Sequence, residues 1–513
     1  MVQGVAIVKG EVVCRNPATG EEIVRVPVSR PEQVDAAIAT ARSAQPGWQA
    51  VPLAQRISTL KCALRELRDG DMSGLAKLVT LEMGKVLEEA QAEVSGAVDK
   101  DAFLALIQQA NEPVQVLGSV IYREAHGVVA LCTPWNFPVD EILLLALPAL
   151  AAGNTVVVKP SEVTPLSGAA TVNALRRGLS AAGHEGVCQL LQGDGEVGAR
   201  LVSHPDVSLV AMTGSSATGS RIMGACASGL KRLVLELGGK DPMVVFSDAD
   251  LELAAKDAVS GSLTNTGQVC SSVERVYVAS SVRDEFCAKV VEEARQWVSG
   301  PGLDACSKIG PLVSDMQRQL VHKHVLQAEA AGATVALGGR MPPPSARGYF
   351  YPATVLFDVP QQAMREETFG PVVSIATFDD TEEMAVRLAN DSEYGLSASV
   401  YTQDLAKAKR VGLHLKAGQV GINNNPLDTA PLECPWAGHK RSGFGYHSGA
   451  DGWRQFSVPK SLIAVPGTAV GTASVVDQAA LTKRLSALAA ATALGMAIGM
   501  TVGVVLGRAR RGS

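Results

Sequence analysis

Cys270 is the first candidate for chemistry, because it lies in Gly267-Gln-Val-Cys270-Ser-Ser, between a glycine and two small hydroxyl residues. A cysteine thiolate is a nucleophile that can bond covalently to a carbonyl carbon. The chain has nine cysteines, scattered without a CxxC pair or a Cys/His cluster at zinc-ligand spacing. Most of these cysteines are typical of free or buried thiols in a reducing compartment. We therefore expect no metal site, and Cys270 needs partners before it indicates an enzyme.

Three other segments place polar side chains beside glycine or proline. A carboxylate in such a position can act as a general base, and a side-chain amide can donate a hydrogen bond to an oxyanion. Each segment alone is weak, because such residues also cap helices and bind backbone groups. Their combination with Cys270 favours an enzyme. The segments are Glu236-Leu-Gly-Gly-Lys240, Pro134-Trp-Asn136-Phe-Pro138 and Glu366-Glu-Thr-Phe-Gly-Pro371.

Short apolar runs alternate with helical patterns in the middle of the chain. This order predicts a parallel sheet with helices on both faces, which commonly binds a dinucleotide at the carboxyl ends of its strands. The expected strands are Val128–Cys132, Thr155–Lys159, Val187–Leu191, Val207–Met212 and Leu233–Leu237. Before them, Pro31–Ser43, Leu53–Leu67 and Met72–Ile107 read as helices.

The strand and helix pattern restarts after Gly238-Gly239. A chain of 513 residues is too long for one compact core, so two or three domains are expected. Residues 240–428 predict a second α/β domain. Its first elements are a strand at Met243–Phe246, a helix at Leu251–Leu263, a strand at Glu274–Ala279 and a helix at Asp284–Ser299.

From about Val13 to Ile463 the chain resembles the aldehyde dehydrogenase superfamily, whose members use NAD or NADP. The order and rough spacing of the motifs also fit that family. The matching segments are Asn16-Pro-Ala-Thr-Gly-Glu21, Pro134-Trp-Asn-Phe-Pro138, Lys159-Pro-Ser-Glu162, Thr213-Gly-Ser215, Glu236-Leu-Gly-Gly-Lys240, Gly267-Gln-Val-Cys270, Glu367-Thr-Phe-Gly-Pro371 and Lys440-Arg-Ser-Gly-Phe-Gly445.

The resemblance implies a covalent mechanism. Cys270 would attack an aldehyde to form a thiohemiacetal, whose oxyanion the Asn136 amide and the Cys270 backbone N–H would hold. Hydride loss would leave a thioester, and Glu236 would activate water to hydrolyse it. An enzyme that passes the acyl group to coenzyme A needs no such base, so Glu236 argues against that alternative. A catalytically silent, membrane-anchored relative is a further alternative, against which the intact Cys270, Glu236 and Asn136 count.

The resemblance also implies the cofactor contacts. Lys159 and Glu162 would contact the adenosine ribose, and a carboxylate there would repel a 2′-phosphate, which favours NAD over NADP. Gly214 and Ser215 would open a helix toward the pyrophosphate. Four further residues are assigned to the cofactor site, of which the last two would hold the nicotinamide ribose and ring: Trp135, Leu237, Glu367 and Phe369.

The expected architecture is an α/β fold with a Rossmann-like cofactor domain, an α/β catalytic domain, a small β oligomerisation element and a C-terminal helix. We assign residues 1–111 and 127–239 to NAD binding and residues 240–428 to catalysis. Residues 112–126 and 429–460 would form the oligomerisation element, adding strands to a neighbouring subunit's sheet. A homodimer or homotetramer follows by resemblance.

The C-terminal tail suggests a membrane anchor. Leu485–Leu506 carries no charge and lies between basic residues, and its length suits a bilayer. Glycines at every fourth position would allow close helix packing: Gly495, Gly499, Gly503 and Gly507. Residues 461–484 would be a linker, and the protein would be intracellular, tail-anchored with its catalytic domain in the cytosol. The alternative is an Ala-rich helix docked on the protein.

The substrate is left open by the sequence. A net charge of −5 gives no indication of nucleic acid binding, and the expected substrate is a small-molecule aldehyde. Asp140 and Glu141 read as acids that offset a helix dipole, or as groups that attract a cationic amino-aldehyde. Long-chain aldehydes and succinate semialdehyde are also candidates. Trp436 and His439 depart from the family's pattern, and we expect them to shape a subunit contact.

Overall fold

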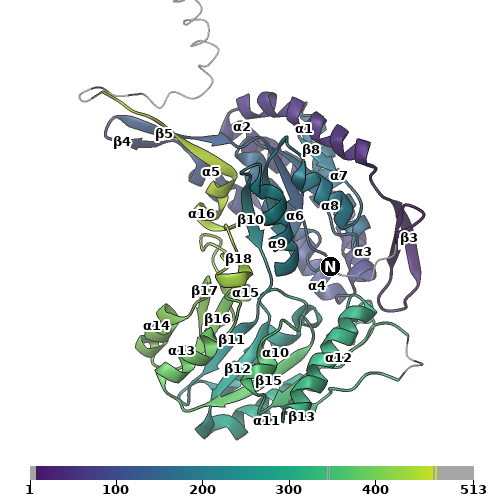
Figure 1. Ribbon diagram of the computed structural model, residues 1–513, viewed down its shortest axis with the longest axis vertical. Coiled ribbons are helices and arrows are strands. Elements are labelled where there is room, and N and C mark those ends of the chain that lie inside the picture. Colours follow the sequence, from purple (N-terminus) through teal and green to yellow (C-terminus); the bar gives the residue numbers. More distant parts are fainter. Residues whose placement is uncertain (1–6, 344, 346, 466–467, 469, 471–513) are drawn as a thin grey trace, which may run out of the picture.

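The computed structural model describes residues 7–343, 345, 347–465, 468 and 470, in which two large sheets carry helices on their faces (Figure 1). The predicted α/β fold class is confirmed. The first sheet has six strands in the order β18-β10-β9-β6-β7-β8. These are β6 (Val128–Cys132), β7 (Thr155–Lys159), β8 (Cys188–Leu190), β9 (Val207–Thr213), β10 (Arg232–Glu236) and β18 (Gly443–Phe444).

Five strands of the first sheet run parallel, and β18 pairs antiparallel with β10. Alternate side chains enter different cores: Val129 and Leu131 join one cluster, whereas Val128 and Ala130 join another. Such burial on both faces is the reason for the continuous apolar runs in the sequence. The helices that cover the sheet include α1 (Pro31–Ala50), α2 (Leu53–Arg68), α6 (Asp140–Ala151), α7 (Pro165–Ala181), α8 (Gly195–Ser203) and α9 (Ser216–Ala227).

The second sheet has seven strands in the order β13-β14-β15-β12-β11-β16-β17. It is parallel except for β13, which pairs antiparallel with β14. Its strands are β11 (Asp241–Val245), β12 (Val273–Ala279), β13 (Thr334–Leu337), β14 (Thr354–Phe357), β15 (Val372–Phe378), β16 (Ser397–Tyr401) and β17 (Gln419–Ile422). Its helices include α10 (Leu251–Leu263), α11 (Arg283–Ala294), α12 (Asp315–Ala330), α13 (Glu382–Asn390) and α14 (Leu405–His414).

The single helix predicted over residues 72–107 is wrong. Three helices occupy this stretch: α3 (Met72–Met83), α4 (Leu87–Val98) and α5 (Asp101–Asn111). Gly84 ends α3 at a φ of +95°, and a Cβ there would lie 2.8 Å from Pro311 Cγ. Gly84 has a left-handed backbone conformation and packs closely against Pro311, and it breaks the helix. The apolar periodicity of the sequence nevertheless continues past it.

Two three-stranded sheets complete the described fold. One is formed at the N-terminus by β1 (Ile7–Val8), β2 (Glu11–Arg15) and β3 (Glu22–Pro27). In the other, β5 (Ser119–Ala125) pairs with β4 (Val114–Val116) and, over six residues, with β19 (Ser457–Leu462). This second ribbon projects from the body (Figure 1). The domain boundaries and the oligomerisation role stay predictions.

Segments near residue 450 also reach the first sheet. Besides β18, Trp453 and Phe456 are buried in its larger core cluster. The region 429–460 therefore contributes to the cofactor-side sheet as well as leading into β19.

No helix within the described residues is long and apolar enough to cross a membrane. The candidate span Leu485–Leu506, the expected C-terminal helix and most of the linker 461–484 lie outside those residues.

Candidate active site

The carboxyl ends of the first sheet meet the amino ends of the second. Glu236 ends β10, and Asp241 already begins β11, so four residues carry the chain from one sheet to the other. Cys270 lies in the loop before β12, and a Cβ on Gly239 would lie 2.1 Å from the Cys270 carbonyl oxygen. The Glu236 segment and the Cys270 loop are thus in direct contact, as the chemistry predicted for them requires.

Burial is the main cause that raises the pKa of the Cys270 thiol well above its usual value. The neighbouring carboxyls of Glu236 and Glu141 raise it further. Burial also raises the pKa of Glu236 to about 7, against contacts with Cys270 and Trp436 that lower it. A carboxyl that titrates near neutrality can accept a proton from a thiol or a water and return it.

Asn136 is buried in the loop after β6, and its Nδ2 donates to the Gln268 carbonyl at 3.0 Å. Asn265 Nδ2 donates to the Asn136 backbone carbonyl at 3.1 Å and to the Gln268 carbonyl at 3.1 Å. The Asn136 amide has two N–H groups, of which one has an acceptor among the described residues. The network joins the Asn136 loop to the Cys270 loop.

The Cys270 loop has an unusual backbone. Asn265, Thr266 and Gly267 have φ values of +53°, +60° and +71°, all in the left-handed region. The loop is fixed by Glu89 of α4, whose carboxylate accepts from Asn265 N at 2.8 Å, and by Gln268, whose Oε1 accepts from Val313 N at 2.9 Å. Strained backbone of this kind persists where surrounding contacts hold it. Sequence reasoning missed Glu89, which lies in a helix without a distinguishing motif, and gave no role to Gln268, although it lies in the Gly267-Gln-Val-Cys270 segment.

The predicted turn at Glu367 and Phe369 lies at the amino end of β15. Glu367 accepts from Gly239 N at 2.9 Å, and burial raises its pKa to about 8. Glu274 accepts from Thr368 N and Phe369 N, both at 2.8 Å, and its partner Lys240 lies 2.5 Å away. This buried ion pair positions the turn.

The predicted cofactor residues from the first sheet gather near its carboxyl end. Lys159 ends β7, and its Nζ donates to the carbonyls of Pro160 at 3.0 Å and Gly193 at 2.6 Å and lies 3.4 Å from Glu162. The Glu162 carboxylate is partly exposed. It can accept hydrogen bonds from ribose hydroxyls.

The start of α9 has the geometry expected for a phosphate. Ser215 is its N-cap and is exposed, while Gly214 N donates to the Glu236 carbonyl at 3.0 Å. A Cβ on Gly219 would lie 2.7 Å from Leu237 Cδ1, so α9 packs closely on the strand end. Free backbone N–H groups at a helix N-terminus favour anions.

Trp135 is buried and makes an edge contact with Phe369, with ring centroids 5.6 Å apart. These features fit a dinucleotide.

Trp436 and Glu141 lie near Glu236 and Cys270, and the subunit contact expected of Trp436 stays a prediction. The Trp436 indole N–H donates to Glu236 Oε1 at 3.2 Å, so this residue contacts the predicted base. Asp140 and Glu141 do lie in the first turn of α6. Asp140 is 2.7 Å from Lys100 Nζ, whereas the Glu141 carboxylate accepts from Thr213 Oγ1 at 2.9 Å.

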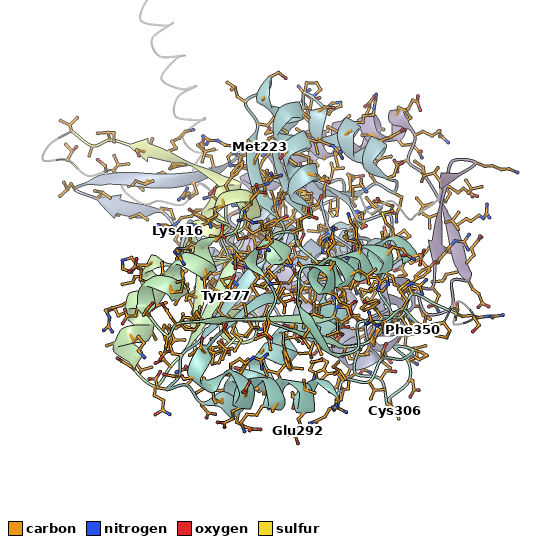
Figure 2. The ribbon with its side chains drawn as sticks, turned by 60° about the horizontal axis from the view of Figure 1, so that its bottom comes forward. Met223, Tyr277, Glu292, Cys306, Phe350 and Lys416 are labelled. Carbon is orange, nitrogen blue, oxygen red and sulfur yellow. The ribbon has the colours of Figure 1, made fainter. Side chains whose placement is uncertain are left out.

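The other cysteines lie elsewhere in the fold, and of these Cys14 also contacts a carboxyl, that of Glu82, at 3.5 Å. Cys14, Cys188, Cys226 and Cys287 are buried, and Cys306 lies at the rim of the molecule (Figure 2). All nine are free thiols. Within the described part of the chain, no group of three or more His, Cys, Asp or Glu residues could hold a metal ion.

Several known proteins are similar to this chain in sequence and fold. The family model for the aldehyde dehydrogenase family matches residues 7–462. The chain is 40% identical to the betaine aldehyde dehydrogenase of Brucella anthropi over 461 residues, which are 88% of this chain and 93% of that protein. Two solved structures are similar with TM-scores of 0.83. The lactaldehyde dehydrogenase of Escherichia coli is 36% identical, over 89% of this chain and 96% of that one. The betaine aldehyde dehydrogenase of Staphylococcus aureus in complex with NAD+ is 33% identical, over 90% and 93%.

Proposed function

The chain belongs to the aldehyde dehydrogenase family, and we propose that it oxidises an aldehyde to a free carboxylic acid with NAD through a covalent intermediate on Cys270. The observation that carries the proposal is the meeting of Cys270, Glu236 and Asn136 where the two sheets face each other. A nucleophile, a base that titrates near neutrality and an amide donor are the groups that acyl chemistry on a carbonyl needs.

The first step uses Glu236 as a base toward Cys270. The thiol proton passes to the Glu236 carboxylate while the sulfur bonds to the aldehyde carbon, because burial keeps the free thiol protonated. The free N–H of Asn136 and the Cys270 backbone N–H then stabilise the oxyanion. Removing one such donor typically costs about 10²–10³ in rate.

The second step hydrolyses the thioester. When bound, the nicotinamide accepts the hydride of the thiohemiacetal. Glu236 next releases the thiol proton to solvent. It then takes a proton from a water whose oxygen attacks the thioester carbon, and the Cys270 sulfur leaves. A base in this position favours hydrolysis over acyl transfer to coenzyme A. It also disfavours a silent scaffold, which would not need it.

NAD is proposed over NADP because of Glu162. Its partly exposed carboxylate can accept from ribose hydroxyls and would repel a 2′-phosphate. The Staphylococcus aureus relative was crystallised with NAD+. Glu162→Gln should lower the preference for NAD over NADP, measured as the ratio of kcat/KM values. An unchanged ratio would contradict this assignment.

An aldehyde that carries a cationic group is the proposed substrate class. The betaine aldehyde dehydrogenases among the relatives act on such a compound, as their names state. The site also has an excess of carboxyls near Cys270, with Glu236 and Glu141 beside the thiol and the Trp436 ring next to them. Carboxylates and aromatic faces attract a substituted ammonium group.

The test is NADH formation by the purified protein with betaine aldehyde, lactaldehyde, succinate semialdehyde and a medium-chain aldehyde. We expect activity that Cys270→Ala abolishes, with the highest kcat/KM for betaine aldehyde. A preference for succinate semialdehyde would contradict the cationic class while leaving the reaction intact. No NADH from any aldehyde would contradict the reaction itself.

A further inference from the structure

Glu141 lies beside the base and is not needed by the mechanism above. Thr213 and Glu236 are direct partners in the pairing of β9 with β10, and Thr213 Oγ1 donates to Glu141 Oε2 at 2.9 Å. One residue thus joins the two carboxyl-bearing segments. Glu236 is 6% exposed, and its Oε2 has no hydrogen-bond partner within the described residues.

The neighbouring acids separate into two kinds. Asp140 lies 2.7 Å from Lys100 Nζ, and Glu93 of α4 lies 2.6 Å from Lys85 Nζ. Among the residues that the structure describes, neither Glu141 nor Glu236 has an ion pair with a lysine, arginine or histidine. The nearby His447 does not supply a charge, because burial lowers its pKa to about 4. Two close carboxyls without a counter-charge resist ionising together.

We propose that Glu141 and Glu236 act as one unit, in which two carboxyls on segments that Thr213 joins share a single proton at neutral pH. Glu141 is then a positioning residue that acts through Glu236. The charge of Glu236 is also a cause of the raised pKa of Glu141, after burial, and that pKa lies at about 8. Such a pair titrates in two steps that belong to both groups.

The inference rests on the proposed function and adds a proton balance to its second step. Once the proton taken from the thiol has left to solvent, the pair again holds one proton. Water then loses a proton to Glu236 as its oxygen bonds to the thioester carbon, which leaves the pair with two protons. The carbon–sulfur bond then breaks, the sulfur keeps the electron pair, and one proton of the pair passes to Cys270. The pair returns to one proton and the cysteine to a thiol.

Hydrolysis of p-nitrophenyl acetate tests the unit without cofactor or aldehyde, because the ester acylates Cys270 and leaves a thioester. The deacylation rate is measured against pH. In the wild type the rising limb should have two steps, because the singly protonated pair already accepts a proton from water and the fully ionised pair accepts one more readily. In Glu141→Gln the rising limb should become a single step and move to lower pH by about one unit.

Thr213→Val is a second variant, in which the valine side chain has nearly the same shape as the threonine side chain that it replaces. Without the hydroxyl, Glu141 should hold the shared proton more firmly, so the rising limb should move in the same direction by a smaller amount. Glu383→Gln is the matched control, because Glu383 is an exposed acid in the first turn of α13. It should retain the wild-type profile.

The outcomes separate the two hypotheses. If the wild type is not acylated at Cys270, the proposed function fails. If it is acylated but Glu141→Gln, or Thr213→Val where the first variant does not fold, retains the wild-type profile, Glu141 has no part in the unit. A shift to higher pH in either variant would also overturn the inference.

Discussion

At the scale of single residues, Asn136 gives a direct test of oxyanion stabilisation. Asn136→Ala removes the free amide N–H and also the bond to the Gln268 carbonyl. We expect kcat to fall by about 10²–10³, with a smaller effect on KM. Asn173→Ala, on α7 and bound to Arg176, should retain wild-type kcat. Steady-state kinetics would check both, and an Asn136→Ala variant within fivefold of wild-type kcat would remove the amide from the mechanism.

At this scale, the sequence allowed a site residue to be predicted only where that residue lies in a local motif. Cys270, Glu236 and Asn136 could be predicted because each lies in a short segment with glycine or proline beside it. Trp436 could not be placed, since its contact with Glu236 joins residues 200 positions apart. Glu89 was missed and the role of Glu141 was left open because their partners are also distant in the sequence. Their partners, Asn265 and Thr213, become neighbours through the packing of α4 and α6.

At the scale of elements, Gly267 is the position where the Cys270 loop tolerates no side chain. Its φ is +71°, and a Cβ would lie 2.1 Å from the Gly370 carbonyl oxygen. We expect Gly267→Ala to lower the free energy of unfolding by at least about 2 kcal/mol and to slow alkylation of Cys270.

The control for that prediction is Gly47→Ala within α1. No atom lies within 4 Å of a Cβ there, and φ is not positive. Alanine should therefore stabilise the helix by up to about 1 kcal/mol. Thermal unfolding and mass-spectrometric alkylation of the Cys270 peptide measure both variants. Equal stability of the two would show that the loop relaxes around the new methyl group.

Elements were predicted best where they are buried on both faces. The strands around β6, β7, β9 and β10 are short, mainly apolar runs between breakers, which the sequence shows directly. The helices at residues 72–111 were not separated, because Gly84 breaks them while the apolar pattern continues. The short strand β18 has two residues and was not predicted, since pairing with β10 rather than local sequence defines it.

At the scale of the whole molecule, the chain order of the two sheets explains why the site lies between them. The carboxyl ends of the strands in the first sheet face the amino ends of the strands in the second sheet. The cofactor segments and the Cys270 segment therefore meet between the two sheets. The alternating pattern of strands and helices in the sequence indicated two α/β units, but it did not indicate which edges of the two sheets face each other. That arrangement depends on contacts across the crossing segment 237–240.

The tail is a separate hypothesis at this scale. Leu485–Leu506 has 22 residues without a charge, which suits the roughly 20 residues that cross a bilayer. We expect the intact chain to sediment with membranes and a chain truncated after Lys483 to remain in the supernatant. The same distribution for both chains would remove the anchor hypothesis and leave the enzyme unaffected.

The central claim is a thioester on Cys270 that Glu236 hydrolyses, and Glu236→Gln tests it most directly. Mixed with NAD and an aldehyde substrate, this variant should release at most about one NADH per active chain and then stop. The release should be slower than in the wild type, because Glu236 also takes the thiol proton, and mass spectrometry should find the acyl group on the Cys270 peptide. The wild type should turn over steadily without accumulating that adduct. Steady turnover by Glu236→Gln at the wild-type rate, with Cys270 unmodified, would contradict the account.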